Sequence, residues 1–191
     1  MEALMPWRRM FGNHDGNFNP LSLLMWDMFL ADGPCTRVLD GDANYGEMLA
    51  NVELPNVTEV IAVEPNSLLR PYLRRTLEED GLEARYVCVA ASDTKGTARF
   101  LRDDDWSGTS RVLEVDEEAG NWLEVPQITA DSIVAETRGT LRLARKVDVE
   151  GNETAVLRGA YQSLARAADY SILCRDKAHS RNRPSVDLRQ F

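Results

Sequence analysis

The sequence is poor in cysteine and has no long apolar run, and both shortages exclude classes of protein. Its 191 residues include three cysteines, which are far apart and form no CxxC pair or Cys/His cluster: Cys35, Cys88 and Cys174. Neither a disulfide framework nor a zinc site is therefore expected. The longest apolar stretch, residues 21–31, is interrupted by Ser22 and Asp27 and is too short to span a bilayer.

Basic charge is also scarce. The chain has 22 Lys and Arg against 31 Asp and Glu, a formal net charge of -9, and no long basic run. Because Lys and Arg neutralise phosphates in nucleic-acid complexes, nucleic acid is not expected as a partner. The N-terminal sequence MEALMPWRRMFG lacks the basic-then-apolar order of a secretory signal, so we expect a cytoplasmic protein without a membrane partner.

What the chain does contain is an alternation of apolar strands with helices. A first helix is expected between Asn19 and Gly33, with Pro20 in its first turn. Strands are expected at 37–40, 59–63, 85–91, 146–149 and 170–174, and further helices at 46–52, 67–80 and 153–167. Apolar strands separated by helices favour an α/β fold, in which a mostly parallel sheet has helices on both faces.

Acidic residues stand at the carboxyl ends of the expected strands: Asp40, Glu64, Ser92–Asp93 and Asp148–Glu150. These ends form the ligand-binding edge of an open parallel sheet. A single acid at such a place more often caps a turn or the following helix, where the helix dipole favours negative charge. Four acidic positions around one edge favour a binding site.

The loop after the first strand, GDANYG at 41–46, indicates which nucleotide-like ligand fits. A pyrophosphate requires G-x-G-x-x-G and main-chain N–H groups open to an anion, whereas Asp42 places a carboxylate there. Glu64 lies about 20 residues further on, where an acid binds ribose hydroxyls in dinucleotide folds. NAD(P) and S-adenosylmethionine both carry a ribose, and the loop favours S-adenosylmethionine because its sulfonium and ammonium tolerate nearby acids.

These residues resemble the motifs of the FkbM-type S-adenosylmethionine-dependent methyltransferases. The family's first motif, approximately D-x-G-A-N-x-G, has four matches: Asp40, Ala43, Asn44 and Gly46. The segment VIAVEPN is similar to its second-strand signature, through Glu64, Pro65 and Asn66. Further similar blocks continue to about Cys174: VAASDTKGTARF, WSGTSR, VPQITADSI and KVDVEGNETAVLRGA. The resemblance implies a class I methyltransferase-like, Rossmann-like fold.

The resemblance also implies site residues. Cofactor contacts are expected from the loop and from the ends of the second and third strands: Asp40, Asp42, Ala43, Asn44, Gly46, Glu64, Pro65, Asn66, Ser92 and Asp93. Within this set, Glu64 would bind the ribose hydroxyls, and Ser92 and Asp93 would lie near the adenine. Lys146, Asp148 and Glu150 would face the methyl-transfer site, where an acid orients or deprotonates the acceptor hydroxyl. An ion-pair and capping network that shapes the loop is an equally good interpretation of these three residues.

Three further residues and one ion receive weaker interpretations. Two or three of the acids could hold Mg²⁺, which is not favoured, and no residue is assigned as a metal ligand. His14 and His179 are expected to be solvated, and Trp106 either stacks on an acceptor or is buried.

Two departures from the family pattern bear on the site. Asp42 stands where the family has glycine, which adopts backbone angles that other residues avoid. Gly41 comes directly before it, so Gly41 could adopt those angles in its place, one residue earlier. The class I sheet also has seven strands, whereas only RDKAHSRNRPSVDLRQF follows Cys174. We therefore expect a sheet without the last strands, its open edge covered by the first helix or by a partner such as a second copy.

Together these features predict three parts: an N-terminal segment and helix at 1–35, an S-adenosylmethionine-binding methyltransferase domain at 36–175 and a polar tail at 176–191. The expected reaction is O-methylation of a hydroxyl on a small molecule or sugar. A non-catalytic binding or scaffolding domain, silenced through Asp42, is the first alternative. An NAD(P)-binding Rossmann protein is the second.

Overall fold

The computed structural model describes residues 20–31, 35–54, 56–105, 107–134 and 140–175. The expected tail at 176–191 and the whole segment before Pro20 lie outside this part of the chain, as do His14, Trp106 and His179.

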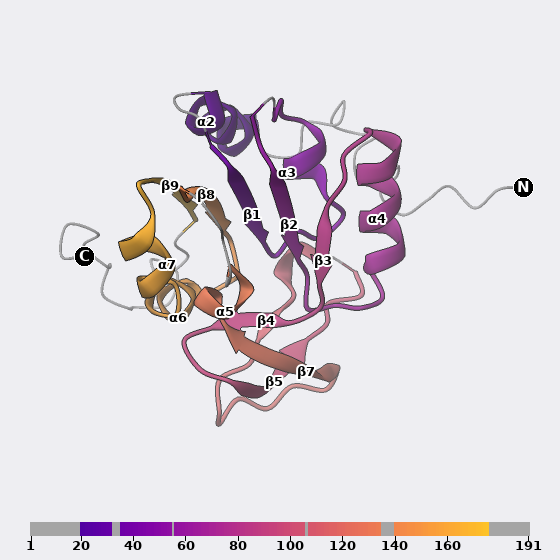
Figure 1. Cartoon of the computed structure of the whole chain (residues 1–191). Coiled ribbons are helices and arrows are strands. Elements are labelled where there is room, and N and C mark those ends of the chain that lie inside the picture. The colour runs from indigo at the N-terminus through magenta and orange to yellow at the C-terminus, as the bar shows by residue number, and fades with distance from the viewer. Residues whose placement is uncertain (1–19, 32–34, 55, 106, 135–139, 176–191) are drawn as a thin grey trace, which may run out of the picture.

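A five-stranded parallel sheet forms the centre of the described structure (Figure 1). Its spatial order is β3-β2-β1-β8-β9, with β1 at Arg37–Gly41, β2 at Glu59–Val63, β3 at Arg85–Val87, β8 at Arg142–Val147 and β9 at Asp169–Cys174. The sheet confirms the predicted α/β fold. Strand β8 begins before the expected strand at 146–149. The sequence did not reveal this start, because the arginines in LRLARKV interrupt the apolar pattern of a strand.

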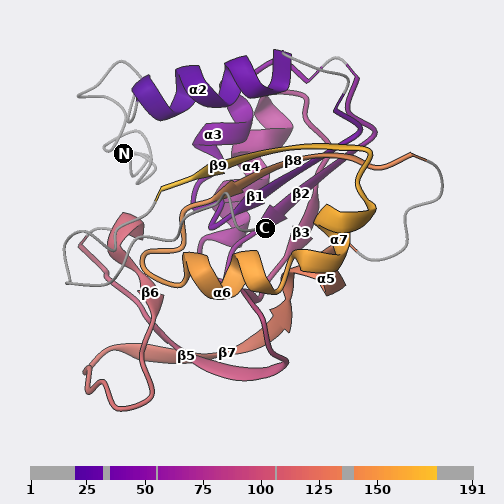
Figure 2. The same ribbon diagram turned by 90° about the vertical axis from the view of Figure 1, so that its left-hand side faces the viewer.

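Helices cover both faces of this sheet (Figure 2). One face carries α2 at Pro20–Ala31, α3 at Glu47–Ala50 and α4 at Arg70–Glu79, and the other carries α5 at Ala130–Ile133, α6 at Glu153–Arg158 and α7 at Tyr161–Arg166. Side chains alternate between two apolar clusters, so that Val38 packs with Trp26 and Leu73 while Leu39 packs with Val156. Among the described residues, no helix combines the length and the apolar character needed to cross a membrane.

A second sheet, which was not predicted, packs below the first in the view of Figure 1. Its order is β4-β7-β5-β6, with β4 at Ala90–Ser92, β7 at Trp122–Thr129, β5 at Gly96–Leu101 and β6 at Arg111–Val112. The expected single strand at 85–91 is therefore wrong. Val89 N donates to Val87 O at 3.2 Å, and this tight turn sends β3 and β4 into different sheets.

The expected helix at 153–167 is interrupted where it crosses the second sheet. Helices α6 and α7 are separated at Gly159–Ala160. A Cβ atom on Gly159 would lie 1.8 Å from the main-chain oxygen of Ser92, so only glycine allows this close approach to β4. The break therefore follows from a tertiary contact, which a helical apolar pattern does not reveal.

Strand β8 also carries a charged side chain into the core. Arg145 is fully buried, and its Nη2 donates to Ser163 Oγ at 3.3 Å. Its Nε and Nη1 have no hydrogen-bond partner among the described residues. Burial lowers the pKa of Arg145 to about 10, which the charge of Asp131 opposes. Buried charges with incomplete pairing are destabilising.

We predict that Arg145→Met raises the free energy of unfolding by about 1–4 kcal/mol, because an apolar side chain of similar length removes this buried charge. Urea denaturation followed by circular dichroism measures the change. Arg75→Met on the exposed side of α4 is the control and should shift stability by less than about 0.5 kcal/mol. A clear loss of stability in Arg145→Met would show that the guanidinium is well paired in solution.

Candidate functional site

The loop between β1 and α3 has an unusual backbone. Asp42, Asn44 and Gly46 all lie in the left-handed region, with φ of 68°, 49° and 88°. Asp42 therefore adopts the left-handed conformation itself. Asp and Asn adopt it more readily than most other residues. Gly41 instead ends β1, where an added Cβ would lie 3.0 Å from the main-chain oxygen of Lys146. The expectation that Gly41 takes over the permissive position is therefore wrong.

A buried ion pair anchors the loop to the sheet. Asp40 in β1 and Lys146 in β8 are register partners, and Lys146 Nζ lies 2.9 Å from Asp40 Oδ1. Lys146 Nζ also donates to the main-chain oxygen of Asp42 at 3.3 Å. Although burial lowers it, the charges of Asp40 and Asp148 hold the pKa of Lys146 above its ordinary value. Lys146 therefore stays a cation that fixes the start of the loop.

Glu64, directly after β2, joins the loop to the next turn. Its Oε2 accepts from Asn44 N and its Oε1 accepts from Asn66 N, both at 2.8 Å. Only 3% of Glu64 is exposed. Ala43 N donates to Val63 O at 2.8 Å, so main-chain bonds hold the loop against the end of β2. Pro65 lies in the same turn and is partly buried.

Three acids of this region are held in an environment that favours their protonated forms. Burial and the charge of Glu64 raise the pKa of Asp42 well above its ordinary value. Burial raises the pKa of Glu64 to about 7, although hydrogen bonds from Asn66 and Asn44 lower it. Burial likewise raises the pKa of Glu47, at the start of α3, to about 7. The region thus holds more carboxyl groups than its single lysine can neutralise.

Two carboxyl oxygens of this group are buried without a hydrogen-bond partner among the described residues: Asp40 Oδ2 and Glu47 Oε2. Unpaired buried acceptors are rare in proteins and suggest an absent donor. A ligand with a positively charged donor, such as an ammonium group, fits this donor-poor site, whereas a pyrophosphate does not. The part of the chain that the structure describes has no group of three or more His, Cys, Asp or Glu side chains arranged to hold a metal ion.

The acids after β8 are paired with an arginine that follows β9. Arg175 Nε lies 2.8 Å from Asp148 Oδ1, and Arg175 Nη2 lies 2.7 Å from Glu150 Oε1. Glu150 has a φ of 56°, so the loop turns sharply between the two acids and α6. Asn152 Nδ2 donates to Ala91 O at 3.2 Å and ties this loop to β4.

Ser92 ends β4, a strand of the other sheet, and Asp93 directly follows it. The expectation that they share one sheet edge with Asp40, Glu64 and Asp148 is therefore wrong, because β4 pairs with β7. Ser92 is buried against Gly159, and Asp93 is exposed. Their contact with an adenine stays a prediction.

Three residues of the site were not predicted from the sequence: Glu47, Ser107 and Arg175. Ser107 Oγ, from the connection between β5 and β6, donates to Asn44 Oδ1 at 3.0 Å, so this connection covers the loop. Arg175 follows directly on β9, and the rule that ligand sites lie at strand carboxyl ends could have found it. Glu47 looks in the sequence like an ordinary acid in the first turn of a helix.

Comparison with known proteins shows a family and a similar solved structure. The model of the methyltransferase FkbM domain matches residues 40–186. The crystal structure of the methyltransferase FkbM from Methylobacillus flagellatus KT matches with a TM-score of 0.49 and 17% sequence identity. That match covers 73% of this chain and 32% of the other, so this chain spans about a third of that protein's length. No curated protein matches the chain.

We predict that Glu47→Gln stabilises the protein relative to wild type as pH rises from about 4.5 to about 7. In that range the folded state keeps the Glu47 proton while the unfolded chain has lost it, so raising the pH favours unfolding of wild type only. The gain should reach at most about 3 kcal/mol, since one pKa unit corresponds to about 1.4 kcal/mol.

Urea denaturation at several pH values between 4.5 and 8 measures this difference. The exposed Glu53→Gln is the matched control. Parallel stability profiles for wild type and Glu47→Gln would contradict the prediction.

Proposed function

Because the chain belongs to the methyltransferase FkbM domain family, we propose that it transfers a methyl group from S-adenosylmethionine to a hydroxyl of a small molecule or sugar. The family, which the sequence motifs predicted, implies methyltransferase activity. The donor, the O-methylation and the acceptor class are our proposal, as is the cytoplasmic location without nucleic-acid or membrane partners.

The excess of buried carboxyl groups around the loop carries the proposal. Asp40 Oδ2 and Glu47 Oε2 lack donors among the described residues, and Lys146 is already paired with Asp40. S-adenosylmethionine carries a sulfonium and an ammonium and one carboxylate, so its net charge complements the site. The pyrophosphate of NAD would instead meet Asp42 and Glu64.

The loop and the end of β2 would hold the cofactor. Each carboxylate oxygen of Glu64 accepts one main-chain N–H, and a carboxylate has about four acceptor positions, so ribose hydroxyls can still bind. Asp40 and Glu47 would receive the ammonium. Ala43, Asn44 and Gly46 would line the loop, while Pro65 and Asn66 shape the turn that presents Glu64.

The residues after β8 would handle the acceptor. When bound, S-adenosylmethionine would supply the electrophilic methyl group for transfer to the acceptor oxygen. The ion pairs with Arg175 fix Asp148 and Glu150 in place, so either carboxylate can orient the hydroxyl and accept its proton. Lys146 contributes by positioning Asp40 and the Asp42 carbonyl rather than by moving a proton.

One observation favours the alternative of a non-catalytic domain. Internal hydrogen bonds already occupy Asn44 and Glu64, and Ser107 covers the loop. A methyltransferase must open this cover to bind its cofactor, whereas a domain that has lost turnover need not. Cofactor binding separates the two functions.

We predict that wild type binds S-adenosylmethionine and S-adenosylhomocysteine but not NAD. Glu64→Gln should weaken binding of both by about 10- to 100-fold, because a hydrogen bond to a charged group contributes about 1.5–3 kcal/mol. Isothermal titration calorimetry measures the affinities, with Glu53→Gln as the control. Binding that is seen only in Asp42→Gly would support the degenerate site, and binding of NAD alone would overturn the proposal.

Methyl transfer provides a separate prediction. With radiolabelled S-adenosylmethionine and a panel of sugars and small alcohols, wild type should label a hydroxyl. Asp148→Asn should lower that rate by about 10²- to 10⁴-fold, with little change in cofactor affinity, because it removes the proton acceptor. The exposed Asp116→Asn serves as the control. Equal rates in wild type and Asp148→Asn would remove Asp148 from the mechanism.

A further inference from the structure

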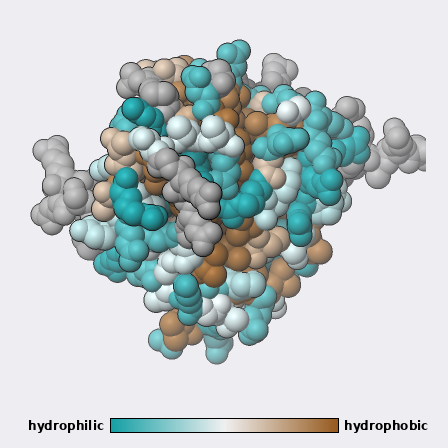
Figure 3. Space-filling model, in the orientation of Figure 1, coloured by the Kyte–Doolittle hydropathy of each residue, from teal (hydrophilic) through white to brown (hydrophobic). Residues whose placement is uncertain are grey.

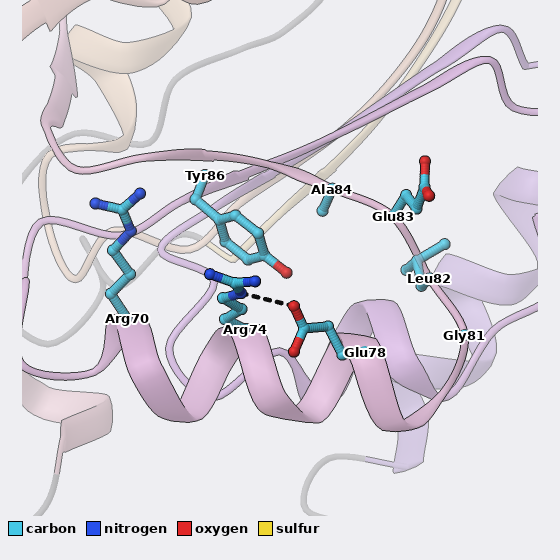
Figure 4. A pocket seen from close by; sticks show the side chains of 8 residues that line it. All are labelled: Arg70, Arg74, Glu78, Gly81, Leu82, Glu83, Ala84 and Tyr86. Atoms are coloured by element: carbon cyan, nitrogen blue, oxygen red, sulfur yellow. Dashed lines mark hydrogen bonds and ion pairs between the residues drawn. The ribbon is translucent and has the colours of Figure 1, made fainter.

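A groove of about 550 Å³ runs along the outer edge of the five-stranded sheet, between α4 and β3 (Figure 4). Its lining comes from α4 and from the segment that leads into and along β3, and it includes two arginines, Arg70 and Arg74, two acids, Glu78 and Glu83, and the ring of Tyr86. Strand β2 separates β3 from β1 and its Asp40. The groove is therefore separated from Asp40 by β2, while the end of β3 lies beside Glu64.

The strand beside the groove has an open edge. Among the described residues, no strand pairs with the outer side of β3. Glu64 N donates to Val87 O at 3.0 Å, so the main chain of Val87 faces β2. Because main-chain groups of successive strand residues point to opposite sides, Tyr86 directs its N–H and C=O to the open side. Strand β3 also lacks the proline and lysine that protect many edge strands.

Charged side chains form a row on the helix opposite this edge. Arg70, Arg74 and Glu78 are spaced by four residues, and Figure 4 shows all three rising from α4 toward the strand, with the Tyr86 ring over Arg74. Arg70 N donates to Ser67 O at 3.3 Å, but the Arg70 guanidinium makes no hydrogen bond or ion pair within the described part of the chain. Arg74 Nε and Glu78 Oε1 lie 2.6 Å apart, but both side chains are more than half exposed, so this pair can exchange for another partner.

The spacing of this row matches that of an extended peptide. Residues four apart on a helix rise about 6 Å along its axis, and alternate residues of a strand are about 6.8 Å apart. A peptide beside β3 would therefore place alternate side chains against Arg70, Arg74 and Glu78 in turn. The surface over α4 is mainly hydrophilic (Figure 3), which favours recognition through charge and main-chain bonds over recognition through apolar contacts.

We propose that this groove binds an extended acidic segment of a partner protein, which adds to β3 as a sixth strand. Its acidic side chains, two residues apart, pair with Arg70 and Arg74, and a basic side chain two residues later pairs with Glu78. Addition in the antiparallel direction puts the acids toward the N-terminus of the segment, because Arg70 lies beside the carboxyl end of β3.

Fluorescein-labelled peptides test the proposal by fluorescence anisotropy. The peptide SEVEVKS should bind to the full chain, and SQVQVKS, which has the same length and strand propensity, should bind at least about fivefold more weakly. Arg70→Glu and Arg74→Glu should each weaken binding of SEVEVKS by a similar factor. Arg75→Glu is the matched control, because Arg75 pairs with Glu79 on α4 and does not line the groove. Circular dichroism checks that each variant folds.

A main-chain readout distinguishes strand addition from simple charge binding. Hydrogen exchange of the Tyr86 amide should slow when SEVEVKS is added. Equal binding of the two peptides, or unchanged binding of SEVEVKS to Arg70→Glu, would contradict the proposal that the partner segment is acidic. Binding of SEVEVKS without protection of the Tyr86 amide would contradict strand addition.

Analytical ultracentrifugation tests whether a second copy of the chain occupies the groove instead. If the protein forms dimers and the peptide dissociates them, the partner is a second copy and the proposed partner protein is wrong. The comparison of peptides stands even if a charge-reversal variant fails to fold.

Discussion

The buried ion pair between Lys146 and Asp40 is the interaction on which the site depends. It joins the carboxyl ends of the neighbouring strands β1 and β8, and Asp40 is fully buried. Removing one partner of a buried pair leaves an uncompensated charge, at a cost of about 3–5 kcal/mol, so neither residue can change alone. Lys146 also holds the Asp42 carbonyl, and the left-handed loop that follows brings Asn44 N onto Glu64. The position of the loop and its contact with Glu64 therefore depend on this pair.

Around the pair, the described residues supply more acid than base. Burial raises the pKa of Asp42, Glu47 and Glu64, while the positive charge of Lys146 lowers the pKa of Asp42 and Glu47. A positive charge bound close to these acids would favour the release of their protons. The proposed S-adenosylmethionine would bring such a charge, whereas the acids would repel a pyrophosphate. An aspartate is therefore compatible with the position where the family has glycine.

The sequence predicted the part of this site that depends on order along the chain. Asp40 lies near the end of β1, Glu64 and Asp148 directly follow β2 and β8, and these three strands are neighbours, so their ends meet. The predictions that were wrong depend on contacts between segments that are distant in the sequence. The turn at Val87–Val89 divides an apolar run that looks like one strand, and Gly159 breaks a helix where it meets Ser92. Arg175 was missed because its partners, Asp148 and Glu150, lie on another strand's loop.

The account's central claim is that protons stand in for a cationic ligand at the buried acids. Proton release on binding tests it most directly. Isothermal titration calorimetry of wild type with S-adenosylmethionine at pH 6.5, in buffers of different ionisation enthalpy, counts the protons exchanged. We expect net release, which falls as pH rises above 7 and is smaller for S-adenosylhomocysteine, because it keeps the ammonium but lacks the sulfonium. Binding with no proton exchange, or with proton uptake, would contradict it.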